Sequence, residues 1–176
     1  MALEPSSLKV HITTDTESEP KASSFLSVEP TLPQPVGSTT SLSYIYSTPP
    51  SFTLANNADL THYLATASSG PPYHFPSAGS TVITHMEFGP NPEQEDGFWH
   101  RTQTVDYIVM LEGELELSLD GGEKKTMKKG DIVIQRAAMH KWKNPSKTES
   151  AKFVGVLLGA EGAVEGGVEY GAKHLR

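Results

Sequence analysis

The sequence predicts an all-β domain, a sandwich or barrel of short strands, and three observations lead to this fold class. Apolar and polar residues alternate over residues 82–88 and again over 115–119, the period of two that turns one face of a strand into a core. Turn signals rich in Gly, Asn and Asp separate such stretches at close intervals. Helical periodicity is scarce. Many short, closely spaced strands are typical of sandwiches and barrels.

The strands are expected in the second half of the chain, each bounded by a turn. The expected strands cover residues 104–111, 114–119, 124–127, 131–135 and 151–158, in addition to the alternating stretch that begins at Thr81. The turns between them fall at residues 112–113, 120–122, 129–131 and 144–146. The one helix that the pattern favours is short, over residues 59–65, with Asn57 or Asp59 as its cap.

Composition divides the chain into an arm, a barrel and a tail. The 176 residues correspond to one domain. Ser, Thr, Pro and Glu dominate residues 12–52, and all but one of the 13 prolines lie at or before Pro92, so this half can bury little apolar area per residue. We therefore expect an irregular N-terminal arm over residues 1–40, a barrel over 41–160 with its core motifs in 97–144, and a Gly-rich tail over 161–176.

Several functional classes are disfavoured by composition. The chain has no Cys, so any metal must be held by nitrogen and oxygen atoms. The net charge of −7 does not resemble a nucleic-acid footprint, and the lysine group over residues 124–129 is expected to be a solvated hairpin tip rather than a phosphate site. No apolar run reaches signal-peptide or membrane-span length. We expect a cytoplasmic protein with no nucleic-acid or membrane partner.

One segment places a histidine and a carboxylate at a strand start. His100-x-Thr102 is followed after three residues by Asp106, and after six more by Gly113. Residues two apart on a strand share a face, so His100 and Thr102 are expected to point the same way, and Asp106 joins them once the chain turns into the next strand.

A second segment brings another histidine from a facing hairpin. Gly130 is followed by His140 and then, after three residues, by Asn144. Two imidazoles and one carboxylate in a barrel mouth form the ligand set of a non-haem iron site and also suit Mn, Zn or Ni. The same groups can exchange protons with a substrate near neutral pH. The structural alternative is a pair of buried imidazoles hydrogen-bonded to the backbone, with Asp106 capping a turn or pairing with Arg101 or Arg136.

The stretches HRTQTVDYIVMLEGELEL and GDIVIQRAAMHKWKNPS resemble the two motifs of the cupin superfamily. They look most like the small single-domain cupins of bacteria and fungi, many of which are accessory enzymes of secondary metabolism. The resemblance implies a single antiparallel jelly-roll β-barrel. It also implies that His100, Asp106 and His140 face the cavity as catalytic residues and as ligands of one divalent transition metal, Zn, Mn, Fe or Ni.

The sequence departs from the family motifs at four positions. Thr102 stands where the second metal-binding histidine of the first motif would stand, and Asp106 replaces the usual glutamate. In the second motif Arg136 and Ala138 replace the usual Pro and Gly, at a turn that ordinarily relies on glycine at positive φ. A threonine hydroxyl is a poor metal ligand, so the motif is compatible either with a weak, open metal site or with a cavity that works without metal.

The resemblance implies a small-molecule enzyme of lyase or isomerase type. It would catalyse decarboxylation, dehydration or cyclisation of an oxygenated polyketide-like or aromatic substrate. One alternative is a metal-dependent dioxygenase, and another is a cupin that binds a small ligand without catalysis. Small cupins commonly dimerise through strands added at a sheet edge, so we expect a homodimer to which the apolar islands at residues 25–26 and 42–46 contribute.

Overall fold

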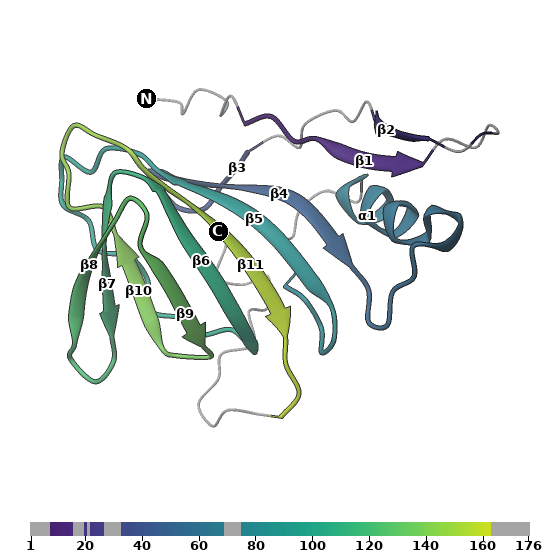
Figure 1. The fold of residues 1–176 in the computed structure, drawn as a ribbon. Helices are drawn as coiled ribbons and strands as arrows, with labels where there is room; N and C mark the ends of the chain where they lie inside the picture. Colours follow the sequence, from purple (N-terminus) through teal and green to yellow (C-terminus); the bar gives the residue numbers. More distant parts are fainter. Residues whose placement is uncertain (1–7, 16–19, 21, 27–32, 69–74, 163–176) are drawn as a thin grey trace.

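The computed structural model describes residues 8–15, 20, 22–26, 33–68 and 75–162, and within them it shows an antiparallel β-barrel. A six-stranded sheet has the order β3-β4-β5-β11-β6-β9, and a three-stranded sheet, β10-β7-β8, packs against its β5, β11 and β6 strands (Figure 1). The strands of the six-stranded sheet are β3 Gln34–Pro35, β4 Thr40–Thr48, β5 Thr81–Phe88, β11 Ala151–Gly159, β6 Thr104–Glu112 and β9 Ile132–Arg136. Those of the three-stranded sheet are β10 His140–Lys143, β7 Glu114–Leu119 and β8 Lys124–Lys128. The all-β jelly-roll prediction is confirmed.

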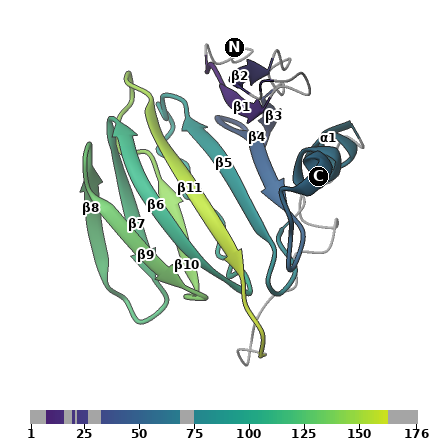
Figure 2. The ribbon, with the colours of Figure 1, turned by 45° about the vertical axis from the view of Figure 1, so that its right-hand side comes forward.

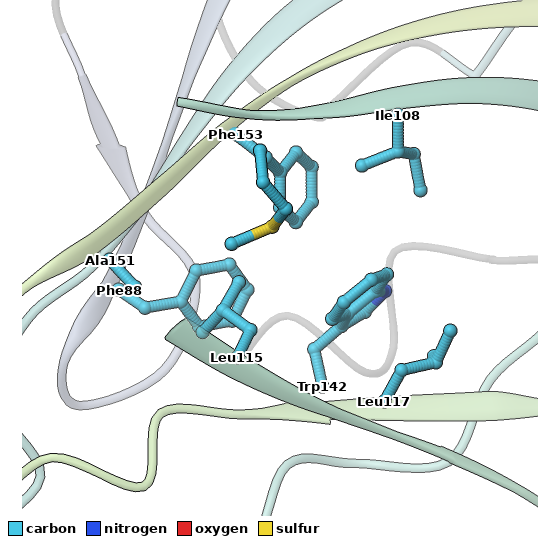
Figure 3. Packing of buried hydrophobic residues seen from close by; sticks show 8 residues of the cluster. Phe88, Ile108, Leu115, Leu117, Trp142, Ala151 and Phe153 are labelled. Atoms are coloured by element: carbon cyan, nitrogen blue, oxygen red, sulfur yellow. The ribbon is translucent and has the colours of Figure 1, made fainter. Parts of the chain in front are cut away.

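The core lies between the two sheets, where inward side chains of both interdigitate (Figure 3). Leu115 and Met110 are almost completely buried, at 0% and 1% exposure. The rings of Phe88 and Trp142 each pack on Phe153, with centroids 5.7 and 5.4 Å away. The alternation of β6 and β7 places Met110 and Leu115 inward, as the period of two requires.

The apolar islands in the first half lie within this chain's own sheets. Residues 42–46 belong to β4, which pairs with β5 along its length and with β3 at Ser41 and Leu42. Residues 25–26 belong to β2 (Ser23–Leu26), which forms a two-stranded ladder with β1 (Ile12–Asp15) inside the arm. In the tail, residues 163–176 lie outside the described residues.

The expected short helix is present and covers one edge of the large sheet. A 3₁₀ turn, η1 (Ala55–Asn57), leads into α1 (Ala58–Ser68), which lies beside β4 together with the β1–β2 ladder (Figure 2). Tyr63 of α1 is buried against Tyr46 of β4, with ring centroids 4.6 Å apart, and the Tyr46 hydroxyl donates to Asp59 at 2.6 Å. No helix among the described residues is long and apolar enough to cross a membrane.

Two features of the sheets position the site. At Gly113, between β6 and β7, φ is +66° and a Cβ would lie 2.5 Å from the carbonyl oxygen of Ser150, so only glycine fits this turn. On β9, Ile132 and Ile134 point outward, whereas Gln135 is buried. Side chains of β9 that alternate with the isoleucines therefore face the barrel interior.

Candidate functional site

A cavity of about 280 Å³ lies between the two sheets and has a mostly apolar wall with one polar cluster. The apolar wall includes Leu42, Val82, Met86, Phe88, Ile108, Trp142, Phe153 and Leu157. The polar cluster consists of His100, Thr102, Asp106, Gln135 and His140. The structure thus brings the three predicted site residues to one cavity, together with Thr102 and with a glutamine that the motif did not indicate.

The two histidines are held directly opposite each other by a backbone bridge. The amide of His100 donates to the carbonyl of His140 at 3.0 Å, and the amide of His140 donates back at 2.9 Å. The ring centroids lie 4.1 Å apart. Nδ1 of His140 lies 2.8 Å from the Ala138 carbonyl, and Nδ1 of His100 lies 3.3 Å from the Phe98 carbonyl. A carbonyl can only accept, so we assign the proton to Nδ1 in both rings and the lone pair to Nε2.

Gln135 joins Asp106 to His140. It is the cross-strand partner of Asp106 in the β6–β9 register, and its side-chain amide donates to Asp106 Oδ2 at 3.1 Å. The same amide nitrogen lies 3.2 Å from Nε2 of His140, which accepts its second hydrogen. Asp106 Oδ1 and Gln135 Oε1 are buried and have no hydrogen-bond partner among the described residues. The cluster therefore keeps two buried oxygen atoms without a partner beside the cavity, which is costly unless a ligand uses them.

Burial favours the neutral form of all three titratable groups. Desolvation lowers the pKa of His140 to about 3, and the positive charge that His100 would carry adds to this effect. Desolvation likewise lowers the pKa of His100, partly offset by the hydrogen bond to Phe98. The pKa of Asp106 is raised by burial, against the opposing hydrogen bonds from Thr104 and Gln135. Near neutral pH the cluster thus holds two neutral imidazoles beside a carboxyl group that is shifted toward its acid form.

The arrangement of these side chains does not fit a divalent metal ion. Among the described residues, no three His, Asp or Glu side chains are grouped so that they could hold one ion. The amide of Gln135 lies against Asp106 and against Nε2 of His140, where a cation would need both donor atoms. The hydroxyl of Thr102 is hydrogen-bonded to that of Thr104 at 2.7 Å.

The turn that carries the second motif forms without glycine. Ala137 takes a φ of +46°, in the left-handed region that costs an L-residue about 1–2 kcal/mol. Its amide donates to the carbonyl of Thr104 at 3.0 Å, which ties the turn to β6. The left-handed residue of this turn is therefore Ala137, whereas Ala138, which stands at the position of the usual glycine, does not take a positive φ.

Part of the cavity wall is a loop that ion pairs attach to β10. Asp96 accepts from Lys141 at 2.6 Å and from Lys143 at 3.3 Å. From the arm, the Ser38 hydroxyl donates to Glu95 at 2.6 Å. Residues of the arm therefore form part of the cavity wall, although the sequence pattern had left them outside the barrel.

His85 of β5 is buried at 4% exposure and is not among the residues that line the cavity. The alternative in which Asp106 pairs with Arg101 or Arg136 is not what the structure shows. Asp106 bonds to Gln135, and the ion pair of Arg101 is with Asp120, at 3.9 Å. No local pattern could have identified Gln135, because the run Ile132-Val133-Ile134 before it is apolar on both faces of the strand.

Comparison of the chain with known proteins identifies a family and several relatives. Residues 84–157 match the family model described as the cupin domain. The "Oryzines biosynthesis cluster protein J" of Aspergillus oryzae is 42% identical over 118 residues, which cover 67% of this chain and 63% of that protein. The "Phomopsin biosynthesis cluster protein C'" of Diaporthe leptostromiformis is 36% identical over 132 residues, 72% of this chain and 67% of that protein.

The name of a third relative states a class of reaction. The "Cupin-domain-containing oxidoreductase srdD" of Neurospora crassa is 38% identical over 97 residues. These residues cover 54% of this chain and 47% of that protein. The chain therefore matches less than half of the length of this relative and less than two thirds of the Aspergillus protein.

Proposed function

The chain belongs to the cupin superfamily, and on that premise we propose that it is an acid–base enzyme of lyase or isomerase type. Its substrate would be a small oxygenated molecule of polyketide-like or aromatic character that enters the barrel cavity. The observation that carries the proposal is the His100–Asp106–His140 cluster at one side of an apolar cavity, with two neutral imidazoles beside a carboxyl group whose pKa is raised by burial.

The cluster supplies both partners of a proton transfer. His100 carries its lone pair on Nε2, so the ring accepts a proton from an acidic C–H or O–H of the substrate. Asp106, with its pKa raised and Oδ1 unsatisfied, returns a proton to an oxygen or carbon of the substrate. Because burial keeps both imidazoles neutral, they add no buried positive charge when the substrate binds.

The rest of the cavity accounts for the substrate class. The wall is built from aliphatic and aromatic side chains, among them Phe88, Trp142 and Phe153, which suit a flat or cyclic carbon skeleton. The unsatisfied Oε1 of Gln135 is an acceptor, so it favours a substrate that presents a hydroxyl or enol hydrogen. The names of the two biosynthesis-cluster relatives are consistent with a role in small-molecule chemistry.

Deuterium exchange tests this proposal without knowledge of the natural substrate. A panel of enolisable hydroxylated aromatic and polyketide-like carbonyl compounds is incubated with the protein in D₂O, and mass spectrometry follows deuterium incorporation and product formation. We expect protein-dependent exchange or conversion of at least one compound. If a compound binds but is neither exchanged nor converted, the cavity serves ligand binding alone, and the acid–base proposal is wrong.

The second candidate is a metal-dependent dioxygenase, which the name of the Neurospora relative favours. The metal ligands would then be His100, Asp106 and His140. The side chain of Gln135 would have to break its hydrogen bonds to Asp106 and His140 to make room for the ion. Stoichiometric iron in protein purified without a chelating tag, together with oxygen consumption in the same substrate panel, would favour this candidate over the first.

Replacing Thr102 with histidine tests whether the side chain at position 102 faces the same point of the cavity as His100, Asp106 and His140. Thr102 is buried and lines the cavity, so Thr102→His adds an imidazole at the position of the usual family ligand. We expect this variant to bind Zn, Mn, Fe or Ni more tightly than the parent protein, measured by calorimetry. Thr102→Val is the matched control, since it removes the hydroxyl without adding a ligand. Equal metal binding by the two variants, both folded, would contradict our description of the site.

A further inference from the structure

A second pocket, of about 390 Å³, lies beside the barrel cavity, between α1 and neighbouring parts of β4 and β5. We call it the α1 pocket. From the helix it is lined by His62 and by Ala65 and Thr66, which follow three and four residues later and so share one face of α1. Among the described residues, none of the three-stranded sheet lines it, so it is distinct from the space between the two sheets. The remaining lining residues are Tyr44, Ser47, Thr48, Phe75, Pro76, Ser77, Ser80, Thr81 and Val82.

The fold leaves room for this pocket because a helix, rather than a strand, covers the outer edge of β4. β3 pairs with β4 only at Ser41 and Leu42, and α1 lies beside β4 (Figure 2). Tyr63 of α1 packs on two tyrosines of β4, with its ring centroid 4.6 Å from that of Tyr46 and 6.4 Å from that of Tyr44. A helix with its side chains is about 10 Å wide, whereas neighbouring strands lie about 4.8 Å apart. The helix therefore leaves space where a further strand would leave none.

The polar wall of the α1 pocket carries no permanently charged group. Its polar side chains are the imidazole of His62 and seven hydroxyls, and among the described residues no carboxylate, ammonium or guanidinium group lines it. Hydroxyls both donate and accept, so this wall suits a ligand group that does both. A charged ligand group would lose its hydration here without gaining a counter-charge. The pocket therefore favours a neutral, hydroxylated group.

Four of the hydroxyls are arranged in two pairs. Oγ1 of Thr48 lies 2.7 Å from Oγ1 of Thr81, and Oγ of Ser77 lies 2.9 Å from Oγ of Ser80. Within each pair one hydroxyl donates to the other, so the accepting hydroxyl keeps its own hydrogen for a ligand. The pairing also holds the four side chains in place before a ligand enters, which lowers the entropy lost on binding.

Ser47 is the polar residue that points most directly to a ligand. It is buried, at 3% exposure, and its Oγ has no hydrogen-bond partner of normal geometry among the described residues. It lies near Tyr44, whose pKa is raised by burial, and the Ser47 hydroxyl opposes that effect. Ser47 is the cross-strand partner of Val82, so the two side chains point to the same side of the sheet. A buried hydroxyl without a partner is costly unless a ligand satisfies it.

The α1 pocket and the barrel cavity share a border. Tyr44, Phe75 and Val82 line both spaces. On one side of this border the wall is mostly apolar, and on the other side it is rich in hydroxyls. A single molecule that spans the border therefore needs an apolar ring joined to a hydroxylated group.

We propose that the α1 pocket binds a neutral group with several hydroxyls, a sugar or a polyol, attached to the apolar ring that occupies the barrel cavity. The inference rests on the proposed function in one respect, namely that a small carbon-ring compound enters the cavity. It does not depend on the reaction, because the residues that line the α1 pocket do not include His100, Asp106 or His140. It adds a polar substituent, on the side of α1, to the proposed substrate class.

NMR titration of the full chain with three matched probes tests the class of ligand. Phenyl β-D-glucopyranoside carries a ring and a neutral sugar, anisole carries the ring alone, and phenyl β-D-glucuronide adds a carboxylate to the sugar. We expect the glucoside to bind about tenfold more tightly than either other probe, since only the glucoside gains hydrogen bonds without desolvating a charge. A glucoside that binds no more tightly than anisole, or a glucuronide that binds as tightly as the glucoside, overturns the proposal.

Two substitutions locate the binding. Ala65→Phe places a ring in the α1 pocket from an exposed position of the helix, and it should abolish the preference for the glucoside over anisole. Ser47→Ala removes the unpartnered hydroxyl and should reduce the preference about threefold to tenfold. The matched controls are Leu64→Phe, on α1 outside the pocket, and Thr126→Val, on β8, and both should leave the preference unchanged. A folded Ala65→Phe variant that keeps the preference overturns the site.

The outcomes separate this inference from the proposed function. Deuterium exchange or conversion of a panel compound, with no preference for the glucoside, would support the acid–base reaction and overturn the α1 pocket as a binding site. A preference for the glucoside that depends on Ala65 and Ser47, with no exchange or conversion of any bound compound, would support the α1 pocket and contradict the acid–base reaction.

Discussion

Replacing His100 with alanine is expected to lower kcat/KM on an exchanging or converted compound by about 10²–10⁴, the usual effect of removing a general base. The ring of His100 lines the cavity with its lone pair on Nε2, whereas Nε2 of His140 accepts from Gln135. Thermal unfolding and near-UV circular dichroism check that the fold is retained, because the core residues lie outside this cluster.

Two further variants make this result specific. His11→Ala alters an exposed histidine of the arm, outside the barrel cavity and the α1 pocket, and should leave the rate within a factor of two. Asp106→Asn keeps the shape of the acid but removes its titration, so it should flatten one limb of the pH–rate profile. Retention of more than a tenth of the parental rate by folded His100→Ala would show that another group is the base.

Acidification is expected to destabilise the protein through His140. Its pKa is lowered to about 3 in the folded state, against about 6.5 when unfolded, so between these values the unfolded chain binds the extra proton. Stability from this group is therefore complete above pH 6.5 and is lost as the pH falls toward 3. The loss approaches about 1.4 kcal/mol for each pH unit at most.

Asp106 acts in the opposite direction and must be separated from His140. Its raised folded pKa gives a contribution that is present at low pH and is lost as the pH rises through that value. Urea unfolding of the parent protein and of His140→Gln at pH 7.5, 6.5 and 5.5 separates the two groups. The free energy of unfolding of the parent should fall more steeply with acidification than that of the variant. Parallel curves would mean that His140 does not stay neutral in the folded protein.

Most strands of the barrel could be predicted from sequence because their alternation is strict or their turns are clear. Residues 114–119 alternate apolar and polar, and a Gly-containing turn bounds them on each side. β10 was not predicted, because its four residues, HKWK, give too short a pattern to define a period. The Leu42–Tyr46 island was recognised, but its place inside the large sheet depends on long-range pairing that no local pattern encodes.

The candidate site was predictable in part for the same physical reasons. His100, Asp106 and His140 were found through motif spacing, and all three line one cavity. Gln135 was not predicted to face the barrel interior. On β9 the run Ile132-Val133-Ile134 is apolar on both faces, so periodicity could not decide which face is inward. The register that sets Gln135 opposite Asp106 decided it.

The reciprocal backbone bridge between His100 and His140 also has a consequence for hydrogen exchange. Each amide is protected by the carbonyl of the other residue, so one local opening exposes both N–H groups to solvent at once. β10 keeps its separate ladder with β7, which does not need to melt for this opening to occur. The two histidines therefore form a small cooperative unit whose opening frequency, rather than global unfolding, governs how often their rings separate.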